Sequence, residues 1–502
     1  MTELWAHLQS GLSVAVTPAN LLLALAGAFA GTLIGALPGI GSTSGVALLL
    51  PLTFGLDPTS AIILLAGVYY GSMYGGTITS VLINTPGESA TIVTTLDGYQ
   101  LAQQGRAGAA LGIATIGSFI AGTAGTLGLM VLAPTLARAA MRFGPPEYFA
   151  LTLLGLAMLV GLGTGSRVKA VASALVGLIL ATVGVDVMTG QPRFTFGQID
   201  LLSGFDFLPV SIALFGFSEI LVVAASPPET LALRRVSLGI RDAFPSRADW
   251  RASRAPIARG TLLGFLIGTL PGAGATIATF ASYFVEKRLS REPGRFGRGA
   301  IEGIAGPEAA NNAASAGSMV PLLTLGLPGG TTTAVLVGAF TMWGLRPGPM
   351  LFEQNPSFVW GLIASMYIGN LMLVVINVAL LPLFLRVMRT PQAVLLPSIV
   401  VLCLVGAFAA NNRLWDVGLM LVFGVAGYWM KKLDYSPAAL VAALVLGPLA
   451  ESSFRQALQI SDGSLAVFVS RPIALGLMTA VAIVVLVPAV RLLVRRAAAP
   501  AR

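Results

Sequence analysis

The chain has little of the charge that a soluble surface needs. Only 10% of its 502 residues are charged and 55% are hydrophobic, and the mean hydropathy is +0.84. So few polar side chains cannot cover the water-exposed surface of a protein of this length. We therefore expect an integral membrane protein.

Cysteine and histidine are almost absent, with only Cys403 and His7. A single cysteine excludes an internal disulfide and a cysteine-based zinc site. A single histidine near the N-terminus leaves the interior without a Ser–His or Cys–His pair, and the chain has no phosphate-binding Walker sequence for ATP. We expect no catalytic residue, no cofactor and no enzyme activity. A membrane enzyme acting on a lipid-linked substrate is the remote alternative.

Basic residues are missing from the first hundred positions, because the first Lys or Arg is Arg106. The N-terminus therefore lacks the positive region of a cleaved signal peptide. The net charge of +9 comes from short loops such as Arg234–Arg259, with seven arginines, and Lys287–Arg298, with five basic residues. This pattern follows the positive-inside rule of membrane proteins and does not indicate a nucleic-acid partner.

Apolar runs recur to the C-terminus, and many approach the roughly 20 residues that cross a hydrocarbon core. The expected fold class is an all-α polytopic membrane protein that lies in a lipid bilayer. We predict full spans near residues 60–84, 108–134, 147–163, 170–188, 207–225, 305–326, 357–385, 393–411, 415–430, 436–450 and 472–490.

An internal repeat is the strongest pattern in the sequence. Gly31–Gly41 returns 233 positions later as Gly264–Gly274, with eight of 11 residues identical. Pro86-Gly87 returns 242 positions later as Pro328-Gly329. Halves that each carry Pro/Gly-interrupted apolar segments are typical of secondary transporters built from repeats. We predict one membrane repeat over residues 1–250 and a second over residues 251–502.

The basic loops predict the topology of each repeat. Only one apolar segment, Gly260–Val285, separates two basic loops, so both of its ends lie on the cytoplasmic side. It therefore forms a re-entrant hairpin that turns near residues 270–276. In the first copy the hairpin turns near residues 37–44, and its arms, Leu21–Ala36 and Ser44–Phe54, reach only about 24 and 17 Å. Because no basic residue precedes Arg106, this hairpin opens to the outside of the cell, and the two repeats are inverted relative to each other. A single crossing by Gly260–Val285 is the alternative.

Four Pro/Gly breaks mark the predicted binding site, near residues 37–44, 84–89, 270–276 and 327–333. At each, Pro and Gly end one helix, and Ser or Thr residues can cap the next. A half-helix that begins there directs free N–H groups at a carboxylate, while released carbonyls can coordinate Na⁺. The alternative is that each break is a packing kink. The predicted substrate- or ion-binding residues at the breaks are Pro38, Gly39, Gly41, Ser42, Thr43, Ser44, Asn84, Thr85, Pro86, Gly87, Pro271, Gly272, Gly274, Thr276, Pro328, Gly329, Gly330 and Thr331.

Three further polar residues, Glu308, Asn311 and Asn312, lie in an apolar segment, where polar side chains are costly and often functional. Glu308 could bind a proton or a cation, or it could simply cap a helix. The two amides could donate to a substrate. Asp97 lies near an expected loop, where a turn or cap is the better interpretation.

The sequence resembles the large membrane subunit of the tripartite tricarboxylate transporters, the TctA family. The resemblance runs over nearly the whole chain. It rests on Gly71–Gly76 leading to Asn84–Gly87, on Asp97–Ala102, on Gly306–Ala314, which contains Gly-Pro-Glu-Ala-Ala-Asn-Asn, and on Pro321–Gly329.

This resemblance implies a multi-pass protein of the bacterial inner membrane that imports citrate or another organic carboxylate by symport with Na⁺ or H⁺. It also implies two partners, a small membrane subunit of four helices and a periplasmic solute-binding protein. A stand-alone carrier or exporter of organic anions, which needs neither partner, is the alternative.

Overall fold

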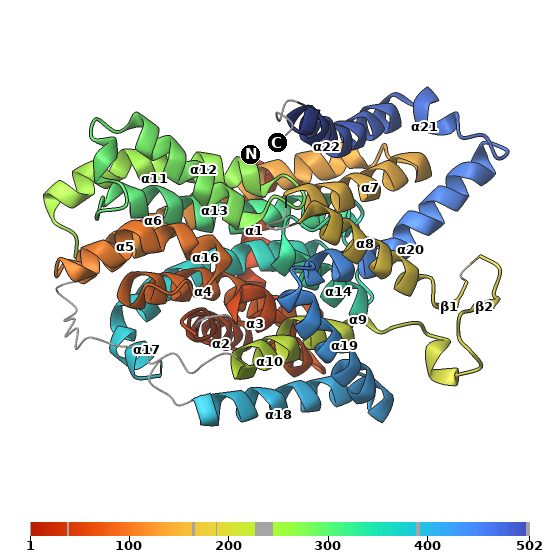
Figure 1. Cartoon of the computed structure of the whole chain (residues 1–502), viewed down its shortest axis with the longest axis horizontal. Helices are drawn as coiled ribbons and strands as arrows, with labels where there is room; N and C mark the ends of the chain where they lie inside the picture. Colours follow the sequence, from red (N-terminus) through yellow and green to blue (C-terminus); the bar gives the residue numbers. More distant parts are fainter. Residues whose placement is uncertain are drawn as a thin grey trace. The chain divides into compact units, whose positions relative to one another are not determined.

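The computed structural model describes residues 2–37, 40–162, 166–186, 188–225, 244–387 and 392–497 (Figure 1). Nearly all of the secondary structure in these ranges is helical. The sheet within them has two short antiparallel strands, β1 (Gly184–Val185) and β2 (Pro192–Arg193), with Gly184 opposite Arg193. The expected all-α fold is confirmed.

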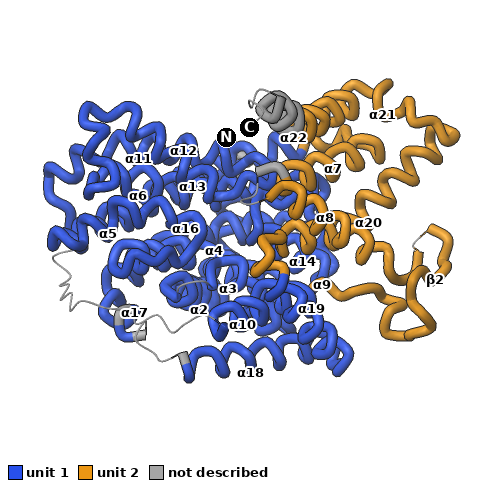
Figure 2. Tube along the Cα trace, in the orientation of Figure 1, with its two compact units in different colours: residues 1–137, 208–429 blue, residues 138–207, 430–502 orange. Residues whose placement is uncertain are grey.

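The chain divides into two compact units (Figure 2). Unit 1 contains residues 1–137 and 208–429, and unit 2 contains residues 138–207 and 430–502. Each unit draws on both predicted repeats, and the repeat boundary near residue 250 stays a prediction.

Unit 1 holds most of the helices, and three of them, α6, α9 and α19, extend a few residues past its limits. Its elements are α1 (Thr2–Ala15), α2 (Pro18–Gly35), α3 (Gly41–Leu49), η1 (Leu50–Thr53), α4 (Pro58–Ile83), η2 (Ser89–Thr91), α5 (Ile92–Gln103), α6 (Ala107–Ala140), α9 (Phe207–Ser211), the π-helix η4 (Ile212–Phe217), α10 (Ser218–Ala225), α11 (Arg247–Gly268), α12 (Gly274–Leu289), η6 (Pro293–Arg295), α13 (Glu302–Leu325), α14 (Thr331–Met342), α15 (Leu351–Gln354), α16 (Pro356–Ala379), α17 (Leu381–Val387), α18 (Gln392–Asn411) and α19 (Leu414–Lys432).

Unit 2 combines helices from the middle and the end of the chain, and α20 packs along both α7 and α8. Its elements are α7 (Pro145–Leu162), α8 (Arg167–Ala181), β1, β2, η3 (Ile199–Leu201), α20 (Pro437–Ile460), α21 (Val467–Ser470) and α22 (Pro472–Ala497).

Seven helices of the described ranges are long and apolar enough to cross a membrane, which makes this a multi-pass membrane protein. They are Pro18–Gly35, Pro58–Ile83, Ala107–Ala140, Phe207–Ala225, Pro356–Ala379, Ala393–Asn411 and Pro437–Ile460. Helix α2 has 18 residues, or about 27 Å, and is therefore longer than the hairpin arm predicted there.

The helices begin where local sequence signals place them. Asp57 precedes Pro58 and accepts hydrogen bonds from the backbone N–H groups of Thr59 and Ser60, which starts α4. Thr17 before Pro18 and Ser436 before Pro437 start α2 and α20 in the same way. These caps use N–H groups that the first helical turn leaves without a partner.

Glycines at every fourth position bring α2 against α4. A Cβ atom added at Gly27, Gly31 or Gly35 would lie 2.2 to 2.3 Å from a backbone carbonyl oxygen of α4. Only glycine allows this backbone approach, which is the small-residue packing common between membrane helices. Gly31, for example, faces the carbonyl oxygen of Val68.

The same contact recurs between α11 and α13, which lie together with α12 in unit 1 (Figure 1). Gly260, Gly264 and Gly268 stand 233 positions after the glycines of α2, and an added Cβ at each would lie 2.2 to 2.5 Å from a carbonyl oxygen of α13. The facing α13 residues stand 242 positions after those of α4: Gly264, for example, faces Ala310 where Gly31 faces Val68. The two offsets in the sequence therefore describe one packing arrangement that occurs twice.

Helix α1 is not predicted from the sequence. Its Gly11 packs against the backbone of Trp360, and the ring of His7 stacks on the Trp360 ring at a centroid distance of 5.0 Å. The one histidine is therefore a packing residue between α1 and α16.

We predict that Gly31→Ala and Gly264→Ala each destabilise the protein, because a methyl group would push a carbonyl oxygen away and separate two helices. Overpacking of this kind typically costs about 1–3 kcal/mol. Thermal unfolding of the purified protein in detergent measures the effect.

Gly418→Ala is the matched control, since Gly418 lies in the exposed part of α19 and an added Cβ there meets nothing within 4 Å. We expect it to be neutral or slightly stabilising. Unfolding temperatures of Gly31→Ala and Gly264→Ala that match that of Gly418→Ala would contradict the packing argument.

Candidate functional site

The described parts of the four predicted breaks lie together in unit 1. Each turn between α2 and α3, α4 and α5, α11 and α12, and α13 and α14 contacts at least one of the others. We call this group the break cluster, formed by residues 40–44, 84–91, 270–276 and 327–333. Segments that are far apart in the sequence thus build one polar region.

The first hairpin turn (residues 40–44) contacts the break after α13 (residues 327–333), which we call the second break, through hydroxyl groups. Ser42 Oγ and Thr332 Oγ1 are 2.8 Å apart, and Thr43 Oγ1 lies 2.9 Å from Thr331 Oγ1. Thr43 also lies 3.0 Å from the Thr332 hydroxyl. These four side chains belong to the first turns of α3 and α14.

The second hairpin turn (residues 270–276) contacts the break after α4 (residues 84–89), the first break, in the equivalent way. Thr276 Oγ1 lies 2.9 Å from Ser89 Oγ. Thr276 stands 233 positions after Thr43, and Thr331 stands 242 positions after Ser89. The Thr43–Thr331 and Thr276–Ser89 pairs are therefore the same contact made twice. A reciprocal pattern of this kind is what a two-fold relation between two copies produces.

The second hairpin also closes on its own break through the backbone. Gly272 N–H donates to the Pro328 carbonyl and Gly274 N–H donates to the Gly329 carbonyl, both at 3.0 Å. Gly272 and Gly274 have φ values of +76° and +65°, a region in which glycine is favoured. The carbonyls of Pro328 and Gly329, two of the predicted substrate- or ion-binding residues, thus accept from the protein itself.

Glu88 occupies the N-terminus of α3. Its carboxylate accepts the backbone N–H of Ser42 and lies beside Gly41, where an added Cβ would be 3.3 Å from Glu88 Oε2. A carboxylate bound at a helix N-terminus is the contact that we predict for a substrate. In the first copy, the protein's own side chain therefore fills this position.

The second copy has no carboxylate at the equivalent position. Gly330 stands 242 positions after Glu88, and its Cα lies against Gly274 at the start of α12. No side chain of the described residues caps α12, whereas Thr333 caps α14 by accepting the Gly330 N–H. The N-terminus of α12 therefore lacks the carboxylate that α3 has, although its first N–H group, that of Gly274, already donates to the Gly329 carbonyl.

The other predicted residues at the breaks have local structural contacts. Ser44 donates to the Phe215 carbonyl in the π-helix η4, and Thr85 donates to the Ile83 carbonyl. Asn84 ends α4 in the left-handed conformation with φ 58°, and its side chain is exposed. Pro86 and Pro271 are half-buried in their turns, and Pro38 and Gly39 lie outside the described residues.

Gly87 and Gly329 are packing glycines. An added Cβ would lie 2.0 Å from the Gly35 carbonyl oxygen at Gly87, and 2.6 Å from the Ser318 Cα at Gly329. For these two residues, the packing interpretation explains the glycine without a ligand.

Glu308 lies inside α13 with an exposure of 1%, and it is not a helix cap. Thr77 Oγ1 donates to one carboxylate oxygen at 2.7 Å, and Thr94 Oγ1 donates to the other. Within the described part of the chain, Glu308 has no ion pair. A buried charge without a charged partner is costly, so a proton or a cation at this carboxyl would lower the free energy of the folded protein.

The neighbouring amides of α13 differ in their contacts. Asn312 Nδ2 donates to Ser118 Oγ at 2.7 Å and to the Glu308 carbonyl at 3.2 Å. Asn311 is fully buried and its side chain interacts with the Glu308 carboxyl. Neither of its amide atoms forms a hydrogen bond of good geometry within the described residues. Both amides therefore keep hydrogen-bonding capacity for another group, Asn311 at both of its amide atoms and Asn312 at its Oδ1.

Asp97 lies inside α5 and is buried, so its predicted position near a loop is wrong. One carboxylate oxygen accepts the N–H groups of Gly297, Gly299 and Ala300, and the other accepts the Tyr283 hydroxyl. Asp97 is therefore not a cap of its own helix, and it instead holds the turn that leads into α13.

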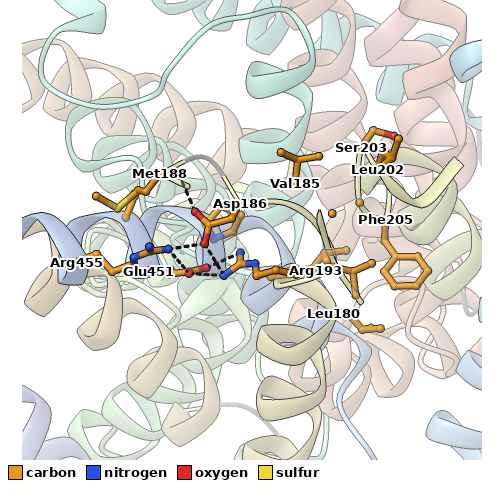
Figure 3. Close-up of a pocket in the computed structure, with 17 residues that line it drawn as sticks. Leu180, Val185, Asp186, Met188, Arg193, Leu202, Ser203, Phe205, Glu451 and Arg455 are labelled. Carbon is orange, nitrogen blue, oxygen red and sulfur yellow. Dashed lines mark hydrogen bonds and ion pairs between the residues drawn. The ribbon is translucent and has the colours of Figure 1, made fainter. Parts of the chain in front are cut away.

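Unit 2 contains a separate cavity of about 230 Å³, shown in Figure 3. Its charged wall joins Arg455 to Asp186 at 2.6 Å, and Arg193 to both oxygens of Glu451 at 2.6 and 3.1 Å. The hydrogen bond from Arg455 holds the pKa of Asp186 well below its ordinary value. This network joins the β1–β2 hairpin to α20. Its two positive and two negative charges balance, so it provides no excess positive charge for an anion.

Sequence reasoning missed three members of the break cluster, Glu88, Ser89 and Thr332. Each stands within or beside a predicted break, but no pattern within one segment reveals that Glu88 reaches α3 or that Ser89 reaches Thr276. The described residues hold no group of three or more His, Cys, Asp or Glu side chains that could bind a metal ion.

The chain is similar to two proteins of Agrobacterium vitis. It is 45% identical over 496 residues, 98% of both chains, to an uncharacterized 52.8 kDa protein in the TAR-I ttuC' 3' region of Agrobacterium vitis. It is 47% identical over 231 residues to an uncharacterized protein in the TAR-II ttuC' 3' region of the same organism, covering 45% of this chain and 96% of that relative. No solved structure matches the chain. The family model of the tripartite tricarboxylate transporter TctA family matches residues 21–442, and the chain therefore belongs to this family.

Proposed function

We propose that this chain is the large transmembrane subunit of a secondary transporter in a bacterial inner membrane. It imports a tricarboxylate, such as citrate, or a related organic carboxylate, by symport with Na⁺ or H⁺. A small membrane subunit of four helices and a periplasmic solute-binding protein that delivers the carboxylate complete the system. The observation that carries this proposal is the break cluster, in which helix N-termini and hydroxyl groups from both halves of the chain meet.

The N-terminus of α12, which has no side-chain cap, is the place that we assign to a substrate carboxylate. Helix N-termini bind carboxylates through free N–H groups and the helix dipole, as Glu88 does at α3. The hydroxyls of Thr276 and Ser89 lie at this end of α12 and can donate to the same anion. Gly330, which has no side chain, leaves the position that Glu88 takes in the first copy.

A multiply charged acid needs more positive charge than one helix end supplies. A helix N-terminus carries about half an elementary charge, so a di- or trianion remains undercompensated. A cation or proton bound in the same unit lowers the free energy of bringing the anion into the low-dielectric interior. The buried Glu308 carboxyl, which accepts the hydroxyls of Thr77 and Thr94, is a group that a proton or cation could neutralise.

We further propose that the two halves are inverted repeats, each with a re-entrant hairpin, α2–α3 and α11–α12. Two observations support this. The glycine contacts of α2 with α4 recur in α11 with α13, and the Thr43–Thr331 contact recurs as Thr276–Ser89. Alternating access then requires only that one copy exchange its conformation with the other around the shared break cluster.

We predict that Gly330→Glu lowers the affinity for carboxylate by about tenfold or more, equivalent to ~1.4 kcal/mol, because it places a carboxylate at α12 as Glu88 does at α3. The measurement is uptake of labelled citrate and other carboxylates into proteoliposomes that hold both membrane subunits. The binding protein is added outside, and a Na⁺ or pH gradient is imposed.

Gly330→Ala is the matched control. Gly330 has an extended backbone with φ −171°, which any residue adopts, and its Cβ would lie 3.2 Å from the Gly274 Cα. We expect near-normal uptake by Gly330→Ala. Equal affinities for Gly330→Glu and Gly330→Ala would remove the assignment to α12, and an absence of carboxylate uptake under either gradient would refute the transport proposal itself.

We also predict that both ends of the α11–α12 hairpin lie on the cytoplasmic face. Arg254 and Arg288 are exposed near these ends, so cysteines introduced there on a Cys403→Ala background should react with a membrane-impermeant maleimide only in inverted vesicles. Ser464→Cys, in the exposed turn after α20, is the control that should react in intact cells with a permeabilised outer membrane. Reaction of either arginine position from outside would replace the hairpin with a single crossing.

A further inference from the structure

A small polar cavity in unit 1 lies apart from the break cluster. It has a volume of about 10 Å³, enough for one small ion or one water molecule. Helices α4, α6, α13 and α16 form it. Its lining residues are Tyr70, Gly122, Thr126, Asn312, Ser315, Ala316, Met366 and Asn370.

The hydrogen atoms of this cavity's polar side chains are nearly all committed elsewhere. Thr126 donates to the Gly122 carbonyl and Ser315 donates to the Asn312 carbonyl. Asn312 Nδ2 donates to two acceptors, Ser118 Oγ and the Glu308 carbonyl. The groups that these side chains can still offer are oxygen lone pairs.

Asn370 follows the same rule. Its Nδ2 donates to the Phe119 carbonyl and to Thr123 Oγ1, both at 2.9 Å, and its Oδ1 accepts the Tyr74 hydroxyl while keeping a second lone pair. The Tyr70 hydroxyl is buried and has no hydrogen-bond partner in the described structure. Of the five polar side chains around the cavity, Tyr70 is therefore the one that still has a hydrogen to donate.

A cavity that presents lone pairs and almost no donors suits a cation. An anion would find only the Tyr70 hydroxyl to bind it. Ca²⁺ and Mg²⁺ sites use carboxylates, and none lines this cavity, so the neutral oxygens favour a monovalent ion. Among the monovalent ions, Na⁺ is the one that takes part in the proposed symport.

We propose that this cavity is a Na⁺ site, with Tyr70 Oη, Thr126 Oγ1, Asn312 Oδ1, Ser315 Oγ and Asn370 Oδ1 as its ligands. Glu308 lies one helical turn before Asn312 on α13, and its carboxyl accepts from Thr77 and Thr94 rather than lining the cavity. Ser318, one turn beyond Ser315, packs against Gly329 in the break after α13. Its hydroxyl also shares a hydrogen bond with the Tyr69 hydroxyl. An ion that orders this face of α13 thereby also orders the break cluster, and its role as the coupling ion rests on the proposed transport function.

Tyr70→Phe is the sharpest test, because it removes a hydroxyl that has no partner and so deletes no hydrogen bond of the ion-free protein. The thermal unfolding temperature of the purified protein is followed as NaCl replaces choline chloride, with KCl as the parallel series. We expect Na⁺ to raise the unfolding temperature more than K⁺ does, as binding to the folded state requires. Tyr70→Phe and Ser315→Ala should each raise the half-saturating Na⁺ concentration about tenfold or more, equivalent to ~1.4 kcal/mol.

Ser365→Ala is the matched control for Ser315→Ala, because Ser365 is also buried and also donates to the carbonyl three residues earlier, but does not line the cavity. It should leave the Na⁺ response unchanged. Equal responses to Na⁺ and K⁺, or a Na⁺ response that Tyr70→Phe does not alter, would show that the cavity holds only water and would overturn the assignment.

Carboxylate uptake by the same variants separates this inference from the proposed function. Specific Na⁺ stabilisation without any uptake would keep the ion site and refute the transport proposal. Carboxylate uptake that does not depend on Na⁺, in a protein without specific Na⁺ stabilisation, would keep the transport proposal and refute the ion site.

Discussion

The backbone contact between α2 and α4, repeated between α11 and α13, is the constraint on which the described structure of unit 1 depends. At Gly31 and Gly264 the carbonyl oxygen of the facing helix lies where a Cβ atom would be, so the helices pack backbone against backbone. Small residues permit this approach, and in a bilayer such packing replaces the hydrophobic effect as the main attraction between helices. The contact places the end of α2 beside Ser72 in α4, and the end of α11 beside Ala314 in α13. The chain after α4 then returns to this level, where Gly87 packs against the Gly35 carbonyl oxygen. The breaks that follow these helices therefore lie close together.

A break in a membrane helix frees backbone groups that lipid cannot satisfy. The break cluster meets this requirement within the protein. Gly272 and Gly274 donate to the carbonyls freed near Pro328, and Glu88 accepts a freed N–H group at the start of α3. The two copies differ at this point, because Gly330 replaces Glu88 in the second. A nearly symmetric framework thus has one N-terminus capped by its own carboxylate and one without a side-chain cap, which gives the two halves different chemistry.

The polar groups of unit 1 separate into two kinds. At the break cluster, N–H groups and hydroxyls can donate to an anion. Around Tyr70 and Asn312, the hydrogens are committed elsewhere, and oxygen lone pairs remain for a cation. Helix α13 carries residues of both regions. The proposed coupling of an anion to a cation would use both kinds of group, because each ligand can then stabilise the conformation that the other binds.

The sequence by itself determined the helices and their interruptions, because those features depend on neighbouring residues. Asp57 before Pro58 starts α4, Pro271 and Gly272 separate α11 from α12, and the repeated glycines reveal the duplication. Helix α1 escaped prediction. Asp97 was placed near a loop because its three N–H partners lie about 200 residues away. Only the tertiary structure decided that Thr43 meets Thr331 across 288 residues and that Glu88 fills the end of α3. It also decided that the donors around Tyr70 are committed elsewhere, since contacts between distant segments leave no periodic pattern in either segment.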